Sequence, residues 1–345
     1  MGAHDELNTA WVEFCDSLKA AGAAVLASHH ASDDVSAAEG MRHLARMVSM
    51  SLTQWIDFSD TSDPRLFRSN DDVWQWGGPN VDNVYIGAPL DPTGTYRLTG
   101  DVSGQPGAVL QVLGQPSGDD PIAVRVDRSL AGGVDGTGRV DLVLSGDESV
   151  DADVRLPADS KRLVLREYLP SLDSRRAGFD IERLDTPGVA PDCSPAKVAG
   201  SLMAARMWLS HNIGFWQDYT DRRLAEVGEN AMEAPHRGPG MGSESIAYST
   251  GFFSLSDDEC MVVSMRVPQA PYWAIQLYSR GWYESLDVTR RRTSLNNTQT
   301  VVDDDGVVRW VISTRDPGCA NWLDAGGHPA GMIHFRAVWC DELPE

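Results

Sequence analysis

Hydrophobic residues in the first sixty positions recur every three or four residues, which is the period of an α-helix. Ser36 followed by Glu39 matches a capping box and predicts the start of a second helix. The turn residues of FSDTSDP predict its end near Asp57. We therefore expect a helical N-terminal segment over residues 1–62. Its first stripe holds Trp11, Phe14, Cys15, Leu18 and Val25, and its second holds Met41, Leu44, Ala45, Val48, Leu52 and Trp55.

The pattern then changes to short runs of β-branched and aromatic residues separated by Gly and Asp turns. Such spacing is typical of antiparallel sheets in a sandwich or a partly closed barrel. Residues 63–190 are therefore predicted to form a β-rich domain. Its expected strands are Val84–Ala88, Thr95–Thr99, Ala108–Leu113, Ile122–Asp127, Arg139–Leu144, Val154–Leu156, Arg162–Leu169 and Phe179–Leu184.

Residues 191–345 are predicted to contain one helix followed by a second β-rich region. Ser194 is a good N-cap, and Pro195 suits the first helical position. The helix should end near Glu226, before Gly228. Together these patterns predict a mainly β protein with added helices, built from antiparallel sandwich or jelly-roll-like units. The expected C-terminal strands are Gly251–Leu255, Met261–Val267, Trp273–Tyr278, Val307–Ser313 and Met332–Trp339.

The connection GENAMEAPHRGPGMGSES, which follows this helix, is longer than most loops. Loops of this length and composition serve as lids or binding loops, or simply cross the surface. Both interpretations stay open at this stage.

The charge and the cysteine content of the chain restrict its expected binding partners and its expected cellular compartment. The chain has 50 acidic and 29 basic residues, which gives a formal net charge of −21. Such a surface repels phosphate polymers and anionic lipid heads, so we expect neither nucleic acid nor membrane as a partner. No apolar stretch approaches the ~18 residues of a membrane span, and the N-terminus lacks the features of a signal peptide. The five cysteines, an odd number without CxxC spacing, favour a reducing compartment, and we predict a cytoplasmic protein.

Several familiar motifs are missing from the sequence. It contains no phosphate-binding P-loop, no dinucleotide fingerprint that opens a helix after a strand, and no GxSxG nucleophile elbow. None of the eight histidines has the local spacing of a metal site. We therefore expect no cofactor and no sequence-local metal site.

The first cluster with possible chemistry is WQWGGPNVDNVY, from Trp74 to Tyr85. A Gly-Gly-Pro turn leads Asn80 and Asp82 into a strand, where short amide and carboxylate groups can fix a hydroxyl or a cation. The alternative is turn chemistry, in which these side chains bind their own backbone.

The second cluster runs from Tyr272 to Gln299 and is the richest in chemistry. Several aromatic residues, among them Trp282 and Tyr283, precede three consecutive arginines. Arginine presents a planar fork of donors to carboxylate or phosphate groups. One interpretation is an anion site beside an aromatic wall, and the other is pairing of the arginines with internal carboxylates. The polar candidates here are Arg290, Arg292, Asn296, Asn297 and Gln299.

The third cluster is STRDPGCANWLDAGGHPAG, from Ser313 to Gly331. Its Trp322 stands among polar residues in a glycine-rich loop. A tryptophan in that setting packs the loop down or stacks on a ligand, and both roles stay open.

With these residues in view, the C-terminal third resembles the bacterial domain-of-unknown-function 1214 family. The resemblance rests on APYWAIQLYSRGWYES, RRRTSLNNTQTV, DGVVRWVIS, DPGCANWLDAGGHPAG and the closing strand FRAVW. The stretch from FRSNDDVW to YRLTG looks like the associated 1254-type N-terminal signature. The resemblance implies a β-sandwich or jelly-roll fold with added helices, in a branch resembling cytosolic actinobacterial members. It also suggests an association with lipid, steroid or terpenoid metabolism.

The leading hypothesis is an enzyme without organic cofactor that acts on a small, largely apolar molecule with one polar or anionic group. Asp82 would be the general acid or base, with Tyr85 or Tyr283 as a secondary proton donor. The reaction would be of lyase, hydratase, isomerase or cyclase type. The remaining candidates would bind the substrate: Asn80, Trp282, Arg290, Arg292, Asn296, Asn297, Gln299 and Trp322.

Two alternatives use the same residues. A non-catalytic β-sandwich protein would bind a small molecule or a carbohydrate through the same aromatic and amide groups, because fold does not determine function. A component of a homo-oligomer would use them as core or interface. The enzyme hypothesis requires that the far end of the chain meets the Gly-Pro-Asn bend in one tryptophan-lined hollow.

Overall fold

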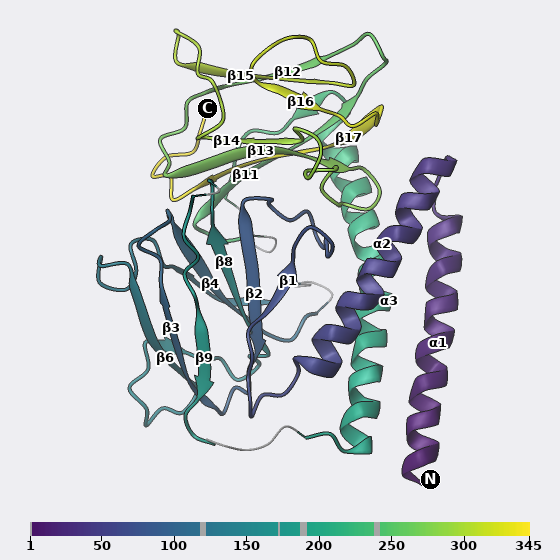
Figure 1. Cartoon of the computed structure of the whole chain (residues 1–345), viewed down its shortest axis with the longest axis vertical. Coiled ribbons are helices and arrows are strands. Elements are labelled where there is room, and N and C mark those ends of the chain that lie inside the picture. Colours follow the sequence, from purple (N-terminus) through teal and green to yellow (C-terminus); the bar gives the residue numbers. More distant parts are fainter. Residues whose placement is uncertain (1, 118–121, 172, 187–191, 238–241) are drawn as a thin grey trace. The chain divides into compact units, whose positions relative to one another are not determined.

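Figure 1 shows a computed structural model of the chain, which describes all residues except 1, 118–121, 172, 187–191 and 238–241. Among the described residues there are three α-helices, one π-helical turn and seventeen strands in four sheets. The protein is therefore mainly β with added helices, as the sequence patterns predicted. Of the long Gly-rich and Pro-rich connection, residues 238–241 lie outside the described part.

Close contacts divide the chain into two compact units. Helix α3 (Pro195–Val227) begins in the first and ends in the second. The grouping places residues 1–62 with the first sandwich, and it takes 75–83 and 170–173 out of the predicted middle domain. Unit 1 comprises Met1–Trp74, Val84–Leu169 and Ser174–Gly214, and unit 2 comprises Gln75–Asn83, Pro170–Asp173 and Phe215–Glu345.

The N-terminal helices are α1 (Ala3–Ala27) and α2 (Asp34–Leu52), and a π-helical turn (Thr53–Asp57) prolongs the second. Phe14 of α1 packs with Leu202 and Ala205 in the first half of α3, and apolar residues of α2 close the same cluster. The helical pair is thus held by a three-helix core inside unit 1.

Two details of α2 differ from the sequence prediction. Its N-cap is Asp33, whose carboxylate accepts the N–H groups of Val35 and Ser36, so the capping box begins three residues early. The buried stripe is also rotated, because His43 is buried whereas Met41 is 39% exposed. The N-cap differs because aspartate and serine are about equally favourable at that position. The buried stripe differs because tertiary packing decides which face of the helix is covered.

Unit 1 contains a sandwich of two sheets. Most neighbouring strands run antiparallel, although β6 and β7 run parallel. The five-stranded sheet has the order β1 (Phe67–Asn70), β2 (Asn83–Pro89), β8 (Arg162–Tyr168), β4 (Gly107–Leu113), β5 (Val124–Ser129). The four-stranded sheet has the order β7 (Val154–Arg155), β6 (Arg139–Ser145), β3 (Thr95–Asp101), β9 (Asp180–Arg183).

The core of unit 1 lies between these sheets. Alternate residues of β4 and β8, such as Leu110 and Leu165, face alternate residues of β3 and β6, such as Leu98 and Leu142. All four are fully buried. The alternation follows from the two-residue period of a strand, and it leaves the outer face of each sheet to other side chains.

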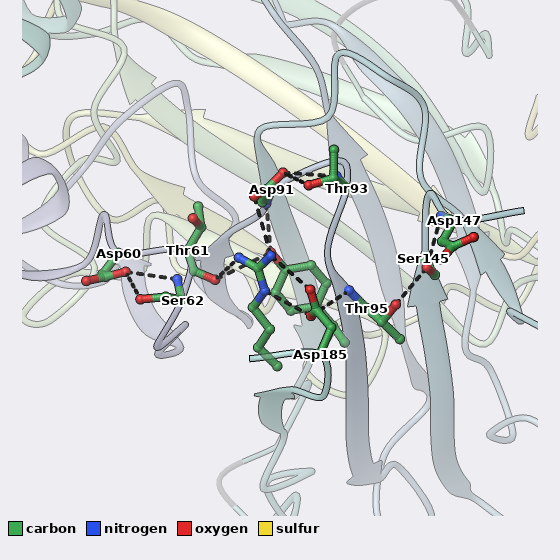
Figure 2. Close-up of polar contacts among 11 residues, drawn as sticks. Asp60, Thr61, Ser62, Asp91, Thr93, Thr95, Ser145, Asp147 and Asp185 are labelled. Carbon is green, nitrogen blue, oxygen red and sulfur yellow. Dashed lines mark hydrogen bonds and ion pairs between the residues drawn. The ribbon is translucent and has the colours of Figure 1, made fainter. Parts of the chain in front are cut away.

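A polar network fixes the end of β9 in unit 1. Arg183 donates from Nε and Nη2 to both oxygens of Asp185, each at 3.0 Å, and from Nη1 to the carbonyl of Thr61 at 3.1 Å. Its guanidinium carbon lies 5.7 Å from the centroid of the Tyr96 ring. Figure 2 shows the surrounding residues, including Asp91, which closes a turn. The network ties the loop after the helices to the four-stranded sheet.

Unit 2 contains the second sandwich, and Figure 1 shows its strands in green and yellow. The five-stranded sheet has the order β10 (Ala231–Met232), β11 (Ile246–Ser254), β17 (Ala330–Val338), β13 (Tyr272–Ser279), β14 (Ser294–Asn296). The smaller sheet has the order β12 (Met261–Arg266), β15 (Val307–Ser313), β16 (Trp322–Asp324).

The core of unit 2 resembles that of unit 1 in its construction. Trp273 and Ile275 of β13 and Phe335 of β17 face Trp310 and Ile312 of β15. The rings of Trp273 and Trp310 meet edge to face, with centroids 5.9 Å apart. The sandwich therefore closes around aromatic side chains.

The longer predicted elements form within a few residues of their expected limits, except that β11 begins at Ile246, five residues before the predicted Gly251. The predicted third helix forms, and the Ser194 hydroxyl accepts the Lys197 N–H at 3.3 Å. The four strands without a sequence prediction are β1, β10, β14 and β16, none longer than four residues. Strands that short show too few alternations to be distinguished from loops. None of the helices in the described part of the chain combines the length and the apolar character needed to cross a membrane.

Candidate functional site

One face of the five-stranded sheet in unit 2 is polar and aromatic although it is buried. Ile333, Phe335 and Ala337 of β17 point into the sandwich core. The strand period of two residues therefore places His334 and Arg336 on the opposite face. Both are buried, with 3% and 7% of their surface exposed.

The neighbouring strand β13 extends this polar face. His334 is paired with Gln276, and Met332 with Tyr278. Gln276 and Tyr278 therefore lie on the same face as His334, and Tyr272 follows by the same alternation. A buried sheet face of this composition needs hydrogen-bond partners for every polar group.

The segment Gln75–Asn83 supplies those partners and belongs to unit 2. The carbonyl of Pro79 accepts from Gln276 Nε2 at 3.1 Å and from the Tyr278 hydroxyl at 3.0 Å. Arg336 donates from Nη2 to the carbonyl of Gly78 at 2.7 Å and from Nη1 to the Tyr278 hydroxyl, also at 2.7 Å. The Gly-Pro bend is thus held by side chains that lie almost two hundred or more residues further along the chain.

Asp82 stands at the end of this segment, with one carboxylate oxygen anchored. Its Oδ2 accepts from the Tyr272 hydroxyl at 2.8 Å and from Asn296 Nδ2 at 2.9 Å. Asn80 braces the same tyrosine, because its Nδ2 donates to the Tyr272 hydroxyl at 2.8 Å. Within the described residues, no hydrogen bond reaches the other oxygen, Oδ1. The carboxyl group is therefore oriented from one side only.

Burial raises the pKa of Asp82 above the ordinary value for a carboxyl group. The hydrogen bonds from Asn296 and Tyr272 act in the opposite direction, because they favour the charged form, but desolvation outweighs them. A carboxyl group with a raised pKa holds its proton closer to neutral pH than an exposed aspartate does. That property suits a group that gives and takes protons.

A second pair of titratable groups, Tyr283 and His334, lies on the same face. The Tyr283 hydroxyl is 2.9 Å from His334 Nε2. Burial raises the pKa of Tyr283 well above 10. Burial also lowers the pKa of His334 well below 6.5, and the charges of Arg336 and Arg223 lower it further. Both groups are therefore neutral at physiological pH, and the pair shares a single hydrogen bond.

The backbone at Tyr283 adopts a left-handed conformation with φ of 51°. Residues with side chains other than Asn and Asp seldom adopt it, and such positions concentrate at functional sites. The ring contacts both Trp216 and Tyr219 of α3, with centroid distances of 5.2 and 5.7 Å. The Tyr283 carbonyl also accepts the N–H of Gly78 at 3.0 Å. Several independent contacts thus impose this strained conformation.

The structure brings four of the residues predicted from sequence onto this face. Asn80 and Asp82 come from the Gly-Pro-Asn bend, and Tyr283 and Asn296 come from the richest cluster. Gln299 supports them indirectly, because its Oε1 accepts the backbone N–H of Asn296 at 3.0 Å.

Asn297, Trp282 and Trp322 have contacts of their own. Asn297 donates its backbone N–H to the Trp273 carbonyl at 2.9 Å. Trp282 is buried, with 3% of its surface exposed. Trp322 belongs to β16 in the smaller sheet, and its Nε1 donates to the Ser313 carbonyl at 3.3 Å.

The structure places the two predicted anion-binding arginines on the surface. The Arg290 side chain is 83% exposed and forms an ion pair with Asp287 at 3.4 Å. Arg292 donates to the Ala320 carbonyl at 3.0 Å. Tyr85 belongs to β2 in unit 1, where the Arg166 guanidinium lies 6.0 Å from its ring. None of the contacts described for these three residues reaches Asp82.

The sequence analysis missed Tyr272, Gln276, Tyr278, His334 and Arg336 as parts of one site. A signal for the last two was present in MIHFRAVW, where a histidine and an arginine occupy alternate positions of a strongly apolar strand. Polar residues at alternate positions of an otherwise apolar strand indicate a second buried face. The pairing of that face with Gly78 and Pro79 depends on contacts that no local pattern contains.

The assembled groups are a carboxyl, phenols, an imidazole, carboxamides and a guanidinium. Asp82 can transfer a proton through Oδ1, while Tyr272 and Asn296 fix the orientation of its carboxyl plane. Tyr283 can donate a hydrogen bond and stays protonated, and Arg336 supplies a fixed positive charge. The arrangement supports general acid–base chemistry and the stabilisation of developing negative charge.

Comparison with known proteins identifies the fold and no activity. No protein-family model and no curated protein matches the chain. It is similar to the crystal structure of an uncharacterized protein from Burkholderia cenocepacia, with a TM-score of 0.88 and 27% identity over 100% of this chain and 97% of that chain. The VPA0106 protein from Vibrio parahaemolyticus has a TM-score of 0.53 and 12% identity over 88% of this chain and 98% of its own, which shows the fold alone.

Proposed function

We propose that the protein is an enzyme whose unit 2 performs acid–base catalysis at Asp82. The observation that carries this proposal is the asymmetric setting of the Asp82 carboxyl group. One oxygen is held by Tyr272 and Asn296, the other has no partner among the described residues, and burial raises the pKa. Oδ1 is not among the buried atoms that lack a partner, so it is accessible to water and to a substrate, while the oxygen that faces Tyr272 and Asn296 is held in place.

The other groups take supporting roles in this proposal. Tyr272 and Asn296 are positioning residues that set the carboxyl plane. Tyr283 acts as a second proton or hydrogen-bond donor, since its raised pKa keeps the hydroxyl protonated. The neutral imidazole of His334 orients that hydroxyl through the 2.9 Å contact.

The proposed substrate is a small, largely apolar molecule with one polar or anionic group. The aromatic residues around Tyr283 support this choice. Trp76 and Trp216 lie with ring centroids 5.4 Å apart, and Trp216 in turn contacts Tyr219 and Tyr283. Aromatic surroundings exclude water and strengthen the hydrogen bonds that stabilise developing charge. A lyase, hydratase, isomerase or cyclase reaction fits this setting, as does the suggested link to lipid, steroid or terpenoid chemistry.

These reaction classes share one feature that can be tested without knowing the substrate. Hydration, elimination, proton-transfer isomerisation and cyclisation that ends in proton loss from carbon all form or break a bond between carbon and hydrogen, so each of these reactions can incorporate solvent deuterium. The protein should be incubated in D2O with a defined mixture of fatty acids, hydroxy acids, isoprenoid alcohols and sterols, and then analysed by mass spectrometry. We expect deuterium in at least one compound with the wild-type protein, and at least a hundredfold slower incorporation with Asp82→Asn.

The matched control is Asp257→Asn, which alters an aspartate whose side chain is 80% exposed. It should leave the rate unchanged. The pH dependence then separates two roles of Asp82. A general base must be deprotonated, so the rate would rise with pH through the raised pKa, whereas a general acid would give a rate that falls. Equal incorporation by Asp82→Asn and the wild type would remove Asp82 from the mechanism.

The same mixture tests the alternative function. A compound that binds saturably and is recovered unchanged, without deuterium, would favour a non-catalytic small-molecule or carbohydrate-binding protein. Equilibrium dialysis followed by mass spectrometry measures that binding directly.

We also propose a cytoplasmic location. All five cysteines are unpaired, and three of them, Cys193, Cys260 and Cys319, are exposed. Exposed free thiols suit a compartment that keeps thiols reduced.

A further inference from the structure

The outer face of the five-stranded sheet in unit 1 carries an arginine with an unusual environment. Leu163 and Leu165 of β8 point into the sandwich core, so Arg162 lies on the opposite face. Its guanidinium carbon is 4.6 Å from the centroid of the Phe67 ring, which belongs to β1. Strand β2 lies between β8 and β1, so the side chain of Arg162 reaches across β2.

Gly87 of β2 makes that reach possible. It is paired with Phe67 and lies beside Arg162 in the sheet. A Cβ at position 87 would be 3.2 Å from Arg162 Nε and 2.7 Å from the Leu163 carbonyl oxygen. Any larger residue would therefore displace the guanidinium from the ring.

The N–H donors of this guanidinium have no acceptor in the described part of the chain. Arg162 Nη2 is buried without a hydrogen-bond partner, and no ion pair or hydrogen bond engages the other nitrogens. Stacking on Phe67 uses the face of the group, whereas the five N–H bonds point outward in its plane. Two other enclosed arginines, Arg183 and Arg336, differ in this respect. Arg183 binds Asp185, and Arg336 binds Gly78 and Tyr278.

The missing partner has an electrostatic consequence. Burial lowers the pKa of Arg162 to about 10, so the group still carries its charge at neutral pH. A desolvated charge without a counter-ion is unfavourable, and an incoming anion would relieve that penalty. A second cation lies on the same face, because Arg166 is four residues further along β8 and its guanidinium lies over the ring of Tyr85.

We propose that Arg162 is the centre of an anion-binding site in unit 1, which takes a carboxylate or phosphate group. The oxyanion accepts two parallel N–H bonds in the guanidinium plane, and the Phe67 ring supports the back of that plane. Tyr85 and Arg166 flank the site along the sheet. The residues of this site belong to unit 1, whereas the Asp82 face belongs to unit 2.

Isothermal titration calorimetry at low ionic strength tests this proposal with two probes, inorganic phosphate and decanoate. We expect saturable binding of at least one probe to the wild-type protein. Arg162→Met keeps an apolar side chain over Phe67 and should weaken that binding by roughly tenfold or more, because the charge-assisted bonds are lost. Arg162→Lys keeps the charge without the planar fork and should bind with intermediate affinity.

Arg68→Met is the matched control. Arg68 is exposed, follows Phe67 on β1, and alternates to the other face. The affinity of the Arg68→Met variant for the probe should stay within about twofold of that of the wild type. Urea unfolding should show that Arg162→Met is at least as stable as the wild type, because no ion pair is broken.

Binding of phosphate alone indicates a phosphorylated ligand, and binding of decanoate alone indicates a carboxylate with an apolar chain. Absence of binding to either probe, or equal binding by Arg162→Met, would overturn the proposal.

Discussion

Gly78 and Tyr283 show how single residues shape the polar face of unit 2. Both adopt left-handed backbone conformations, with φ of 62° and 51°. A Cβ at position 78 would overlap the Tyr283 ring. The glycine is therefore required twice, once by its backbone conformation and once by the close approach of the tyrosine.

This double requirement gives a prediction at the residue scale. Gly306→Ala changes a glycine with φ of 74° that has no atom within 4 Å of the added Cβ, so it should cost only the backbone penalty of about 1–2 kcal/mol. Gly78→Ala should cost about 1–3 kcal/mol more, because the added methyl group displaces Tyr283. Urea unfolding of both variants measures the difference, and equal destabilisation would show that the Tyr283 contact contributes nothing.

Strands β17 and β13 show how the alternating pattern of a strand places different residue types on its two faces. Strands β17 and β13 bury aliphatic and aromatic residues on the core side and polar residues on the other. Arg336 and Gln276 on the polar side donate hydrogen bonds to the carbonyls of Gly78 and Pro79, which lie far away in the sequence. The polar face thus acts as a binding surface for the Gly-Pro-Asn bend, and that bend carries Asp82.

The Arg183 network gives a prediction at the element scale (Figure 2). The hydrogen bonds from Arg183 hold the pKa of Asp185 below its ordinary value. A carboxyl group whose pKa is lowered on folding stabilises the protein above its unfolded pKa of about 4, and that stabilisation disappears as the pH falls through the folded pKa. Arg183→Met should therefore reduce the free energy of unfolding by about 1–2 kcal/mol at pH 7, since solvent screens the partly exposed Asp185. The difference from wild type should shrink below about pH 4.

Urea titrations at pH 7 and pH 3 measure both quantities. Arg97→Met is the control, because Arg97 pairs with Asp141 in the neighbouring strand pair and both side chains are about half exposed. Its effect should be much smaller, since exposed ion pairs contribute little. A difference between Arg183→Met and the wild type that stays constant with pH would assign the effect to packing alone.

At the scale of the whole molecule, the two units are interleaved along the chain. Unit 2 takes Gln75–Asn83 from a region that is otherwise part of unit 1. That segment supplies the acceptor for Arg336 Nη2, which is buried. A buried guanidinium that loses its acceptor is strongly destabilising. The C-terminal part of unit 2 therefore depends on Gln75–Asn83 for this acceptor, and its Asn296 also donates to the carbonyl of Pro170, in the segment Pro170–Asp173 of the same unit.

A fragment of residues 191–345 should accordingly fail to fold cooperatively. Circular dichroism and limited proteolysis would show a broad unfolding transition and rapid cleavage. The same fragment with residues 75–83 joined ahead of it by a long Gly-Ser linker should regain a cooperative transition, because Gly78 and Pro79 again accept from the sheet. A fragment that folds equally well without the added segment would contradict this account.

Much of the secondary structure could be predicted from the sequence because it depends on local periodicity. The alternation in VVRWVIS gave strand β15 with the observed limits, and Ser194 followed by Pro195 gave the start of α3. The N-cap of α2 was misplaced by one turn, because Asp33 and Ser36 are both good caps and only packing distinguishes them. Short strands such as β14 were missed because three residues carry no periodic signal.

The candidate site was predictable only in part. Asp82 and Asn296 were selected as short polar groups in unusual local sequences, and the structure places them 2.9 Å apart. The local pattern in MIHFRAVW marked Arg336 as a polar residue in an apolar strand, but it could not show that Arg336 is buried beneath the Gly-Pro bend whereas Arg290 is exposed. Three adjacent arginines are easily recognised in a sequence as a candidate anion site. A single arginine in an apolar strand indicates a buried site only when the strand's second face is known to be covered by another segment.

The sequence by itself determined where the helices and the longer strands lie. These properties follow from short-range periodicity and from the transfer of apolar side chains out of water. Only the tertiary structure decided which polar groups are buried, which of them meet, and which donors lack acceptors. Those outcomes depend on contacts between residues that are distant in the chain. Such residues form the surroundings that desolvate Asp82 and that leave the charge of Arg162 without a counter-ion.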